Sequence, residues 1–429
     1  MLSLALAYMR DRQLATGLNM LLLALAVATL TILLLASTQL VDRMTRNAQG
    51  IDLVVGAKGS PLQLILSSIY QMDQPTGNIP LASIDMLRRD PAVAQVVPLA
   101  LGDNFRGYRI VGTEASYAGV YGAQLASGRM FDEHGEAVMG AEVAAKLGAG
   151  LGQKFVGSHG LGDGGGAGEH HSHPFTTVGI LRSTGTVLDR LILTSVETVW
   201  DVHGIAHEGE GQQHGESEEP HEHADEQEAH AEQEHDAQAL TESGGQLTPE
   251  VTALLVRYRN AAGAIRIPSM INRQTDMQAA VPAIETTRLL SLLGVGIEGA
   301  RLFAWLLAAV GGLSIFVTLL NATNAREADL ALLRVMGATR ARVFGTVMAE
   351  GLMTALVGGF LGVLIGHSVL AAATRSFSAL GDIGMQPWQP HPGELAIFGA
   401  MVAIGLAAAL IPALRVFKID LAATLARAS

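Results

Sequence analysis

Four long apolar stretches stand out along the chain. They cover residues 17–40, 302–323, 347–373 and 395–414, and the first contains no charged residue across its 24 positions. At 1.5 Å per helical residue, such a stretch extends about 36 Å, more than the roughly 30 Å of a bilayer's hydrocarbon core. Glu350 is the only Asp, Glu, Lys or Arg within the four stretches. The pattern predicts a membrane protein with four transmembrane α-helices.

The first stretch has the apolar character of either a membrane span or a cleaved signal peptide. Its apolar core is longer than the 7–15 residues of a signal peptide, and no A-x-A cleavage site follows it. We therefore expect an uncleaved span at residues 17–40. With four spans, the two termini lie on the same side of the membrane.

The distribution of basic residues predicts which side each segment occupies. Residues 324–346 contain four arginines, whereas residues 374–394 contain one, Arg375. By the positive-inside rule, we expect residues 1–16, 324–346 and 415–429 to be cytoplasmic. Residues 41–290 and the short loop 374–394 are then periplasmic, in a multi-pass protein of the bacterial inner membrane.

The segment 41–290 has the pattern of a folded α+β domain inserted between helices 1 and 2. Short β-rich runs such as "YRIVGT", "HPFTTVGIL" and "VTALLVRYR" alternate with turn residues and with helical runs at 83–91 and 140–150. Residues 268–293 are predicted to be helical and to lead directly into the second span. With residues 41–50, they are expected to form a stalk.

Charge restricts the partners of this domain. Residues 41–290 contain 17 Lys and Arg against 32 Asp and Glu, a net charge of −15, and the rest of the chain is +3. A surface this acidic argues against nucleic-acid binding. The chain has no cysteine, so no disulfide stabilises the domain.

Two insertions are rich in histidine, and we expect both to be mobile. Residues 158–173 and 201–242 hold 11 of the 14 histidines, and no Lys or Arg occurs between Leu191 and Val256. One interpretation is a solvated acidic linker; the other is weak, multi-site binding of Zn or Ni by imidazoles. A catalytic zinc site is not expected, because no H-E-x-x-H motif occurs. The candidate ligands are His170, His171, His173, His203, His207, His214, His221, His223, His230 and His235.

The cytoplasmic segment 324–346 carries its own amphipathic pattern. Glu327 and Asp329 lie in the first turn of a predicted helix, and Leu330, Leu333 and Met336 form an apolar stripe. Gly337 is predicted to end this helix and Thr339 to begin the next one. Taken alone, the stripe suits either the lipid interface or a partner protein.

This segment, "READLALLRVMGATRARVFGTVMAEGL", resembles the coupling segment of the FtsX/MacB family of ABC-transporter permeases. "GEAVMGAEVAAKLGAGLGQKF" (135–155) and "IPALRVFKIDLAATLA" (411–426) are similar to two further family motifs. Asp329 stands where the family commonly has an apolar residue, and Leu421 where it has proline. Ten residues are predicted to contact an ATPase: nine that match the family pattern, and Arg342 close to them. They are Arg326, Glu327, Leu330, Leu333, Arg334, Met336, Gly337, Ala338, Thr339 and Arg342.

The resemblance implies a transporter subunit rather than an enzyme. A separate cytoplasmic ABC ATPase would bind ATP and Mg²⁺, since this chain lacks a G-x-x-x-x-G-K-[ST] motif and needs no cofactor of its own. It also implies mechanotransmission, in which the ATPase moves the periplasmic domain. The expected partners are a second permease copy, membrane lipids and a periplasmic adaptor or substrate lipoprotein. Lipoproteins, lipids, peptides and drug-like molecules are the expected substrates. The alternative function is a zinc- or nickel-linked transporter or sensor.

Two features of the third span need separate interpretation. Gly358, Gly362 and Gly366 recur every four residues and form a close-packing face, either within one chain or at a dimer interface. His367 is the only titratable residue deep in a span. A hydrogen bond to a neighbouring helix is the simpler interpretation of this histidine, and a substrate contact is the alternative.

Overall fold

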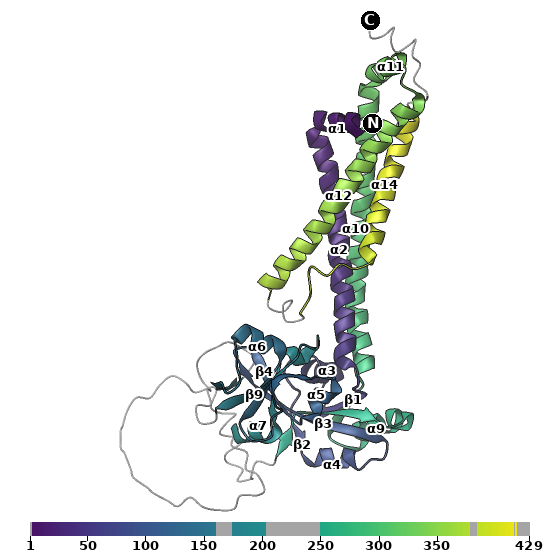
Figure 1. The fold of residues 1–429 in the computed structure, drawn as a ribbon. Coiled ribbons are helices and arrows are strands. Elements are labelled where there is room, and N and C mark those ends of the chain that lie inside the picture. The colour runs from purple at the N-terminus through teal and green to yellow at the C-terminus, as the bar shows by residue number, and fades with distance from the viewer. Residues whose placement is uncertain (1, 160–173, 203–248, 378–383, 416, 418–429) are drawn as a thin grey trace, which may run out of the picture. The chain divides into compact units, whose positions relative to one another are not determined.

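The computed structural model describes residues 2–159, 174–202, 249–377, 384–415 and 417 (Figure 1). The chain divides into two compact units. The helical unit comprises Met1–Arg43 and Arg288–Ser429, and the sheet unit comprises Met44–Thr287. The units are described separately below.

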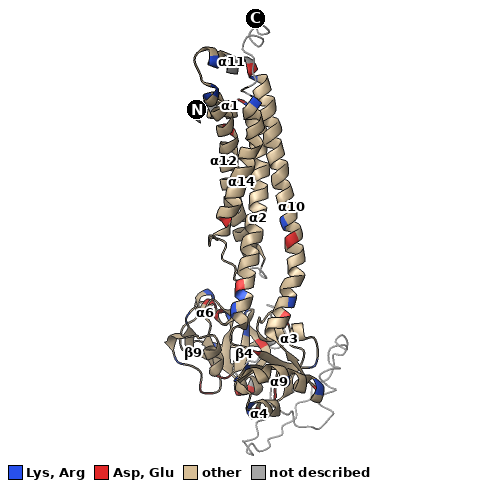
Figure 2. Ribbon diagram, turned by 90° about the vertical axis from the view of Figure 1, so that its right-hand side faces the viewer, with Lys and Arg blue, Asp and Glu red and all other residues tan. Residues whose placement is uncertain are grey.

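Long helices make up the helical unit. Four of those in the described residues are long and apolar enough to cross a membrane, which agrees with the four predicted spans: α2 (Gln13–Ala48), α10 (Pro282–Ala325), α12 (Arg340–Ser376) and α14 (Gly393–Arg415). Two shorter helices, α1 (Leu2–Asp11) and α11 (Glu327–Val335), precede α2 and α12. Figure 2 shows long stretches of α2, α10 and α14 without a Lys, Arg, Asp or Glu.

Helices α2 and α10 are longer than the apolar stretches that revealed them. Each continues through charged residues, Asp42 and Arg43 in α2 and Glu298 and Arg301 in α10. Neither continuation contains a proline within the helix, so backbone hydrogen bonding is not interrupted. Apolar content predicted the membrane crossing, but it did not predict where the helix ends.

The spans pack through small residues. Alanines and branched side chains from α2, α10, α12 and α14 form one core, and three glycines of α12 contact α2. A Cβ added at Gly358 would lie 3.1 Å from Leu23 Cβ, one at Gly362 would lie 2.5 Å from Val27 Cβ, and one at Gly366 would lie 3.1 Å from Thr31 Cβ. A helix of the same chain, α2, therefore packs on this face, and a role of these glycines in a dimer stays a prediction. The core residues are Leu23, Ala26, Val27, Leu30, Ala304, Ala308, Ile315, Leu319, Ala355, Met401 and Ala409.

The sheet unit is an α+β domain, as the alternating pattern predicted, and it is built on one large sheet with both parallel and antiparallel pairs. Its strands lie in the order β13-β1-β12-β3-β4-β10-β6-β9-β5, with β7 paired to β9 and β8 to β3, and β2 and β11 form a separate pair. Parallel pairing occurs between β4 and β10 and between β6 and β9. The strands are β1 (Leu53–Ala57), β2 (Ile79–Pro80), β3 (Val93–Phe105), β4 (Tyr108–Thr113), β5 (Leu125–Gly128), β6 (Glu136–Met139), β7 (Lys154–Phe155), β8 (Ser158–His159), β9 (Phe175–Leu181), β10 (Ile192–Ser195), β11 (Glu250–Val251), β12 (Ala253–Tyr258) and β13 (Met277–Ala280).

Helices cover two hydrophobic cores of this sheet. One core includes Leu87 of α4, Trp200 of α7 and Ile271 of α9, and the other includes Val143 of α6 and Phe175 of β9. The helical runs predicted at 83–91 and 140–150 correspond to α4 and α6. The helices are α3 (Pro61–Ser68), α4 (Ala82–Arg88), α5 (Ser116–Val120), α6 (Ala141–Leu147), the 3₁₀ helix η1 (Val187–Arg190), α7 (Val196–Val202) and α9 (Ala261–Gln274).

The prediction of one helix over residues 268–293 was wrong. Helix α9 ends at Gln274, β13 follows, and α10 begins only at Pro282. The Asn272 side chain accepts a hydrogen bond from Ala279 N–H at 2.7 Å, and β13 pairs with β1 at the edge of the sheet. The four apolar or neutral residues of β13 thus gain a sheet partner that the sequence pattern alone did not reveal.

Candidate coupling surface

The start of α11 is fixed by a buried arginine. Arg326 follows α10, and its side chain lies over the Tyr8 ring of α1, 4.0 Å from the ring centroid. The guanidinium also donates to the Tyr8 carbonyl at 3.2 Å and to the Asp11 carboxylate at 3.4 Å. Arg326 is only 8% exposed. This geometry differs from the predicted partner contact, because Arg326 instead ties α11 to α1.

A role for α1 was not expected from the sequence, since residues 1–16 were predicted only to be cytoplasmic. Tyr8 and Asp11 nevertheless hold Arg326, and Figure 1 shows α1 and α11 at the same end of the helical unit. The signal in the sequence was the amphipathic pattern of residues 2–11. Helix α12 adds Glu350, a buried carboxylate on which the charges of Arg326 and Arg12 act.

The end of α11 is closed by Gly337, as predicted. Gly337 adopts φ +98°, a conformation that residues with a Cβ rarely adopt. Its N–H donates to Arg334 O at 3.1 Å, and Ala338 N–H donates to Leu333 O at 3.0 Å. These two bonds constitute a Schellman motif, which satisfies carbonyls that would otherwise lack a partner. The prediction for Thr339 is also confirmed, since its side chain caps α12 by accepting from Arg342 N–H at 3.3 Å.

One side of α11 packs on the spans. Leu333 and Ala338 lie against Val343 and Val347 of α12 and Ala413 of α14. A contact between the third-last helical residue and the residue after the closing glycine commonly accompanies a Schellman motif. Leu333 therefore anchors α11 to the helical unit and is partly buried there.

An adjacent side of α11 is apolar and exposed. Leu332 is 52% exposed, Val335 61% and Met336 68%. The spacing of three and four residues places these side chains on one helix face. We name Leu332, Val335 and Met336 the α11 face. It differs from the predicted stripe of Leu330, Leu333 and Met336, because Leu333 turns inward and the side chain of Leu330 lies outside the described residues.

The predicted polar residues flank the α11 face in the sequence. Glu327 and Thr339 are exposed and Arg334 is half-buried, while Arg340 and Arg342, in the first turn of α12, are exposed. The segment thus offers an exposed apolar patch, followed in the sequence by two exposed cations. Such a patch suits a partner that supplies an apolar groove with acidic residues at its edge.

The predicted metal ligands cannot be assigned from this structure. All ten candidate histidines, from His170 to His235, lie outside the described residues. Within the described residues, no group of three or more His, Cys, Asp or Glu is placed to hold a metal ion. Metal binding stays a prediction, and zinc titration of the chain with and without residues 201–242 tests it: equal zinc uptake by both forms would reject it.

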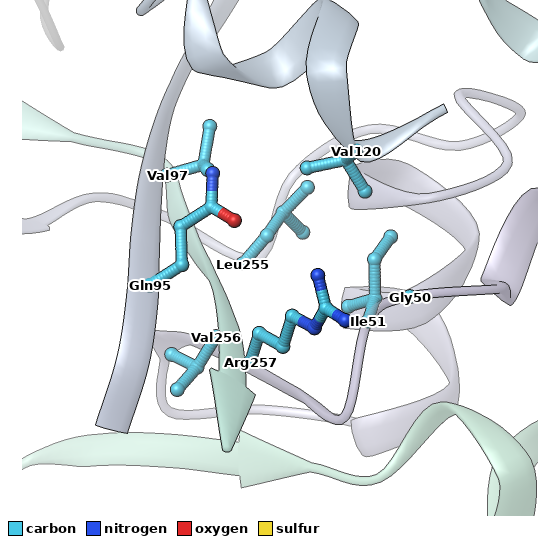
Figure 3. A pocket seen from close by; sticks show the side chains of 8 residues that line it. All are labelled: Gly50, Ile51, Gln95, Val97, Val120, Leu255, Val256 and Arg257. Atoms are coloured by element: carbon cyan, nitrogen blue, oxygen red, sulfur yellow. The ribbon is translucent and has the colours of Figure 1, made fainter. Parts of the chain in front are cut away.

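The sheet unit contains a shallow hollow between β3, β12 and the turn before β1 (Figure 3). Its empty volume, which includes open solvent, is about 180 Å³. Most of the side chains that line it are apolar, and Arg257 and Gln95 supply its polar edge. The lining residues are Gly50, Ile51, Gln95, Val97, Val120, Leu255, Val256 and Arg257.

Comparison with known families supports the interpretation of both units. The model for the FtsX-like permease C-terminal domain matches residues 301–421, and the model for the MacB-like periplasmic core domain matches residues 16–220. These two ranges together cover more than half of the chain. The chain therefore belongs to the class of ABC-transporter permeases, which work with a cytoplasmic ATPase. Within that class it belongs to the FtsX/MacB family, bacterial inner-membrane proteins with a periplasmic domain.

Solved structures with similarity to the chain are distant in sequence. The periplasmic region of MacB from Actinobacillus actinomycetemcomitans is 11% identical with a TM-score of 0.33, and the alignment covers 57% of this chain and 97% of that one. The extracellular domain of the ABC-type transporter YknZ from Gram-positive bacteria is 13% identical with a TM-score of 0.29, covering 53% and 98%. No curated protein matched the chain.

Proposed function

We propose that this chain is a mechanotransmitting permease subunit, and that a separate cytoplasmic ATPase binds it at the α11 face. The observation that carries the proposal is the exposure of Leu332, Val335 and Met336 on a short helix that is fixed at both ends. An exposed apolar patch with two exposed arginines close by in the sequence is costly to leave in water. Because α11 is held at both ends, a partner bound to this patch would displace the spans together with α11.

The contacts of α11 with the neighbouring helices would relay a movement of the ATPase to the spans. Arg326 connects the start of the helix to α1, and Leu333 connects its end to α12 and α14. A displacement of α11 therefore moves the inner ends of several spans together. The basic residues around α11 favour a cytoplasmic location by the positive-inside rule, with both termini on that side. The periplasmic domain would then respond, acting on a lipoprotein, lipid, peptide or drug-like substrate.

A helix lying in the lipid interface is the competing interpretation of α11. Interfacial helices usually bury a long apolar face along the membrane surface. Helix α11 has only nine residues, and its inward side is already packed on α12 and α14. A compact patch of three side chains fits a protein groove better than an extended lipid contact.

Co-purification from a membrane extract of the source cells tests the proposal. The full chain should retain a nucleotide-hydrolysing subunit, and Val335→Asp should reduce its recovery about tenfold, since burial of one carboxylate costs at least about 1.4 kcal/mol. Ile265→Asp is the matched control, because Ile265 is 81% exposed on α9 and far from α11 in sequence. Full recovery with Val335→Asp, or no ATPase with the unmodified chain, would refute the proposal.

A further inference from the structure

The segment that precedes α14 is bonded to three spans. We name residues 384–392 the strap. Its Gln386 N–H donates to the side chain of Gln39 on α2 at 2.8 Å, and the Gln39 amide donates back to Gln386 O at 3.0 Å. Arg43 of α2 donates to Gly384 O, and His367 of α12 contacts Pro387 O. The strap thus joins α2 and α12 just before α14 begins.

A buried histidine–carboxylate pair lies under the strap. His367 is 7% exposed, and its ring stacks on Trp388 of the strap with centroids 5.6 Å apart. His367 Nε2 lies 3.1 Å from Oε2 of Glu394, which is 9% exposed in the first turn of α14. The other carboxylate oxygen, Oε1, accepts from His391 N–H at 2.9 Å.

These contacts determine how many protons the pair holds. A carbonyl oxygen only accepts hydrogen bonds, so His367 Nδ1 must carry a hydrogen to bond with Pro387 O. A neutral His367 then presents a lone pair at Nε2, facing Glu394 Oε2. A hydrogen bond between these two atoms requires one proton, located either on the imidazole or on the carboxyl group.

We propose that His367 and Glu394 form a proton-binding site that keeps the strap closed. With the proton present, the pair makes a hydrogen bond in either arrangement. Without it, a nitrogen lone pair and a buried carboxylate face each other at 3.1 Å, which is repulsive and leaves a charge poorly solvated. A second proton does not break the contact, because an imidazolium still donates to a protonated carboxyl. The strap should therefore open as pH rises.

Other ionisable groups contact the strap without accounting for this effect. Arg43 of α2 stays protonated at all relevant pH values, and its bond to Gly384 O does not depend on pH. His391 lies within the strap, and its Nδ1 accepts from Gly393 N–H at 3.0 Å, so this contact uses the neutral ring. Protonation of His391 would loosen the strap on acidification, which is the opposite direction.

Three variants separate the proton site from a general structural role. Glu394→Gln retains both contacts without a shared proton, because its amide donates to His367 Nε2 and its oxygen accepts from His391 N–H. The strap should then stay closed as pH rises. His367→Phe keeps a ring to stack on Trp388 but loses both hydrogen bonds, so the strap should be open throughout. His391→Asn should behave like the parent chain.

The experiment places one nitroxide on Gln389→Cys, an exposed strap position in a chain without natural cysteines. EPR mobility of the full-length protein is recorded in lipid nanodiscs from about pH 5 to about pH 10. The open-to-closed ratio of the parent should rise by up to tenfold per pH unit within its transition. Mobility independent of pH in the parent, or an opening with rising pH that survives in Glu394→Gln, would overturn the proposal. The test needs no ATPase, so it stands apart from the coupling function.

Discussion

Gly337 sets the geometry of the α11 face because it ends the helix with φ +98°. A residue with a Cβ at this conformation is strained by about 1–2 kcal/mol. We predict that Gly337→Ala raises amide exchange at residues 333–338 about tenfold, which corresponds to about 1.4 kcal/mol. Exchange measured by mass spectrometry tests this. Gly399→Ala in α14 is the control, since its Cβ would meet nothing within 4 Å and no positive φ is involved; equal exchange in both variants would contradict the assignment.

Glu136 gives the sheet unit an acid-sensitive contact. Hydrogen bonds from Arg129, followed by those from Asp132 N–H and Glu133 N–H, lower the pKa of Glu136 to about 2 from its usual 4.5. Because the folded state lowers this pKa, the stabilisation is complete above about pH 4.5 and is lost as pH falls towards 2.

Thermal unfolding at several acidic pH values measures this loss. The melting temperature of the parent should fall below about pH 4.5, and Glu136→Gln should flatten that part of the curve. Glu133→Gln is the control, because Glu133 takes part through its backbone N–H rather than its exposed side chain. An unchanged pH profile in Glu136→Gln would show that the carboxylate contributes nothing to stability.

At the scale of elements, the close approach of α12 to α2 depends on its glycines. A Cβ at Gly362 would lie 2.5 Å from Val27 Cβ and 2.7 Å from Ala24 O, so α2 would have to shift. Overpacking of this kind typically costs about 1–3 kcal/mol. Gly362→Val should therefore lower the melting temperature in detergent, whereas Gly294→Val, whose added Cβ meets nothing within 4 Å, should not. Equal melting temperatures would mean that the two helices are not closely packed there.

The sequence predicted elements well where one physical signal dominated. Apolar length identified the four spans, and Gly337 and Thr339 correctly marked the turn between α11 and α12. It failed where a distant partner decided the outcome. The edge strand β13 exists because β1 accepts it, and the inward direction of Leu333 depends on α12 and α14. A helix that is apolar on several sides does not itself indicate which side is buried.

At the scale of the whole molecule, the sequence motifs predicted the layout and the family, and both family models confirm them. Three features of the sites depended on side-chain geometry instead. These are the contact of Arg326 with Tyr8 of α1, the exposed α11 face and the His367–Glu394 pair beneath the strap. Each brings together residues far apart in the chain, which local periodicity does not record.

In the proposed mechanism, nucleotide binding to a partner ATPase is transmitted through the α11 face and changes the periplasmic domain. Hydrogen exchange of the purified complex, with and without a non-hydrolysable ATP analogue and Mg²⁺, measures this directly. Amide exchange should change in the sheet unit around residues 44–50 and 282–287, and Val335→Asp should abolish that change while Ile265→Asp preserves it. Equal amide exchange of the sheet unit with and without the nucleotide analogue, in the intact complex, would show that α11 does not transmit the change.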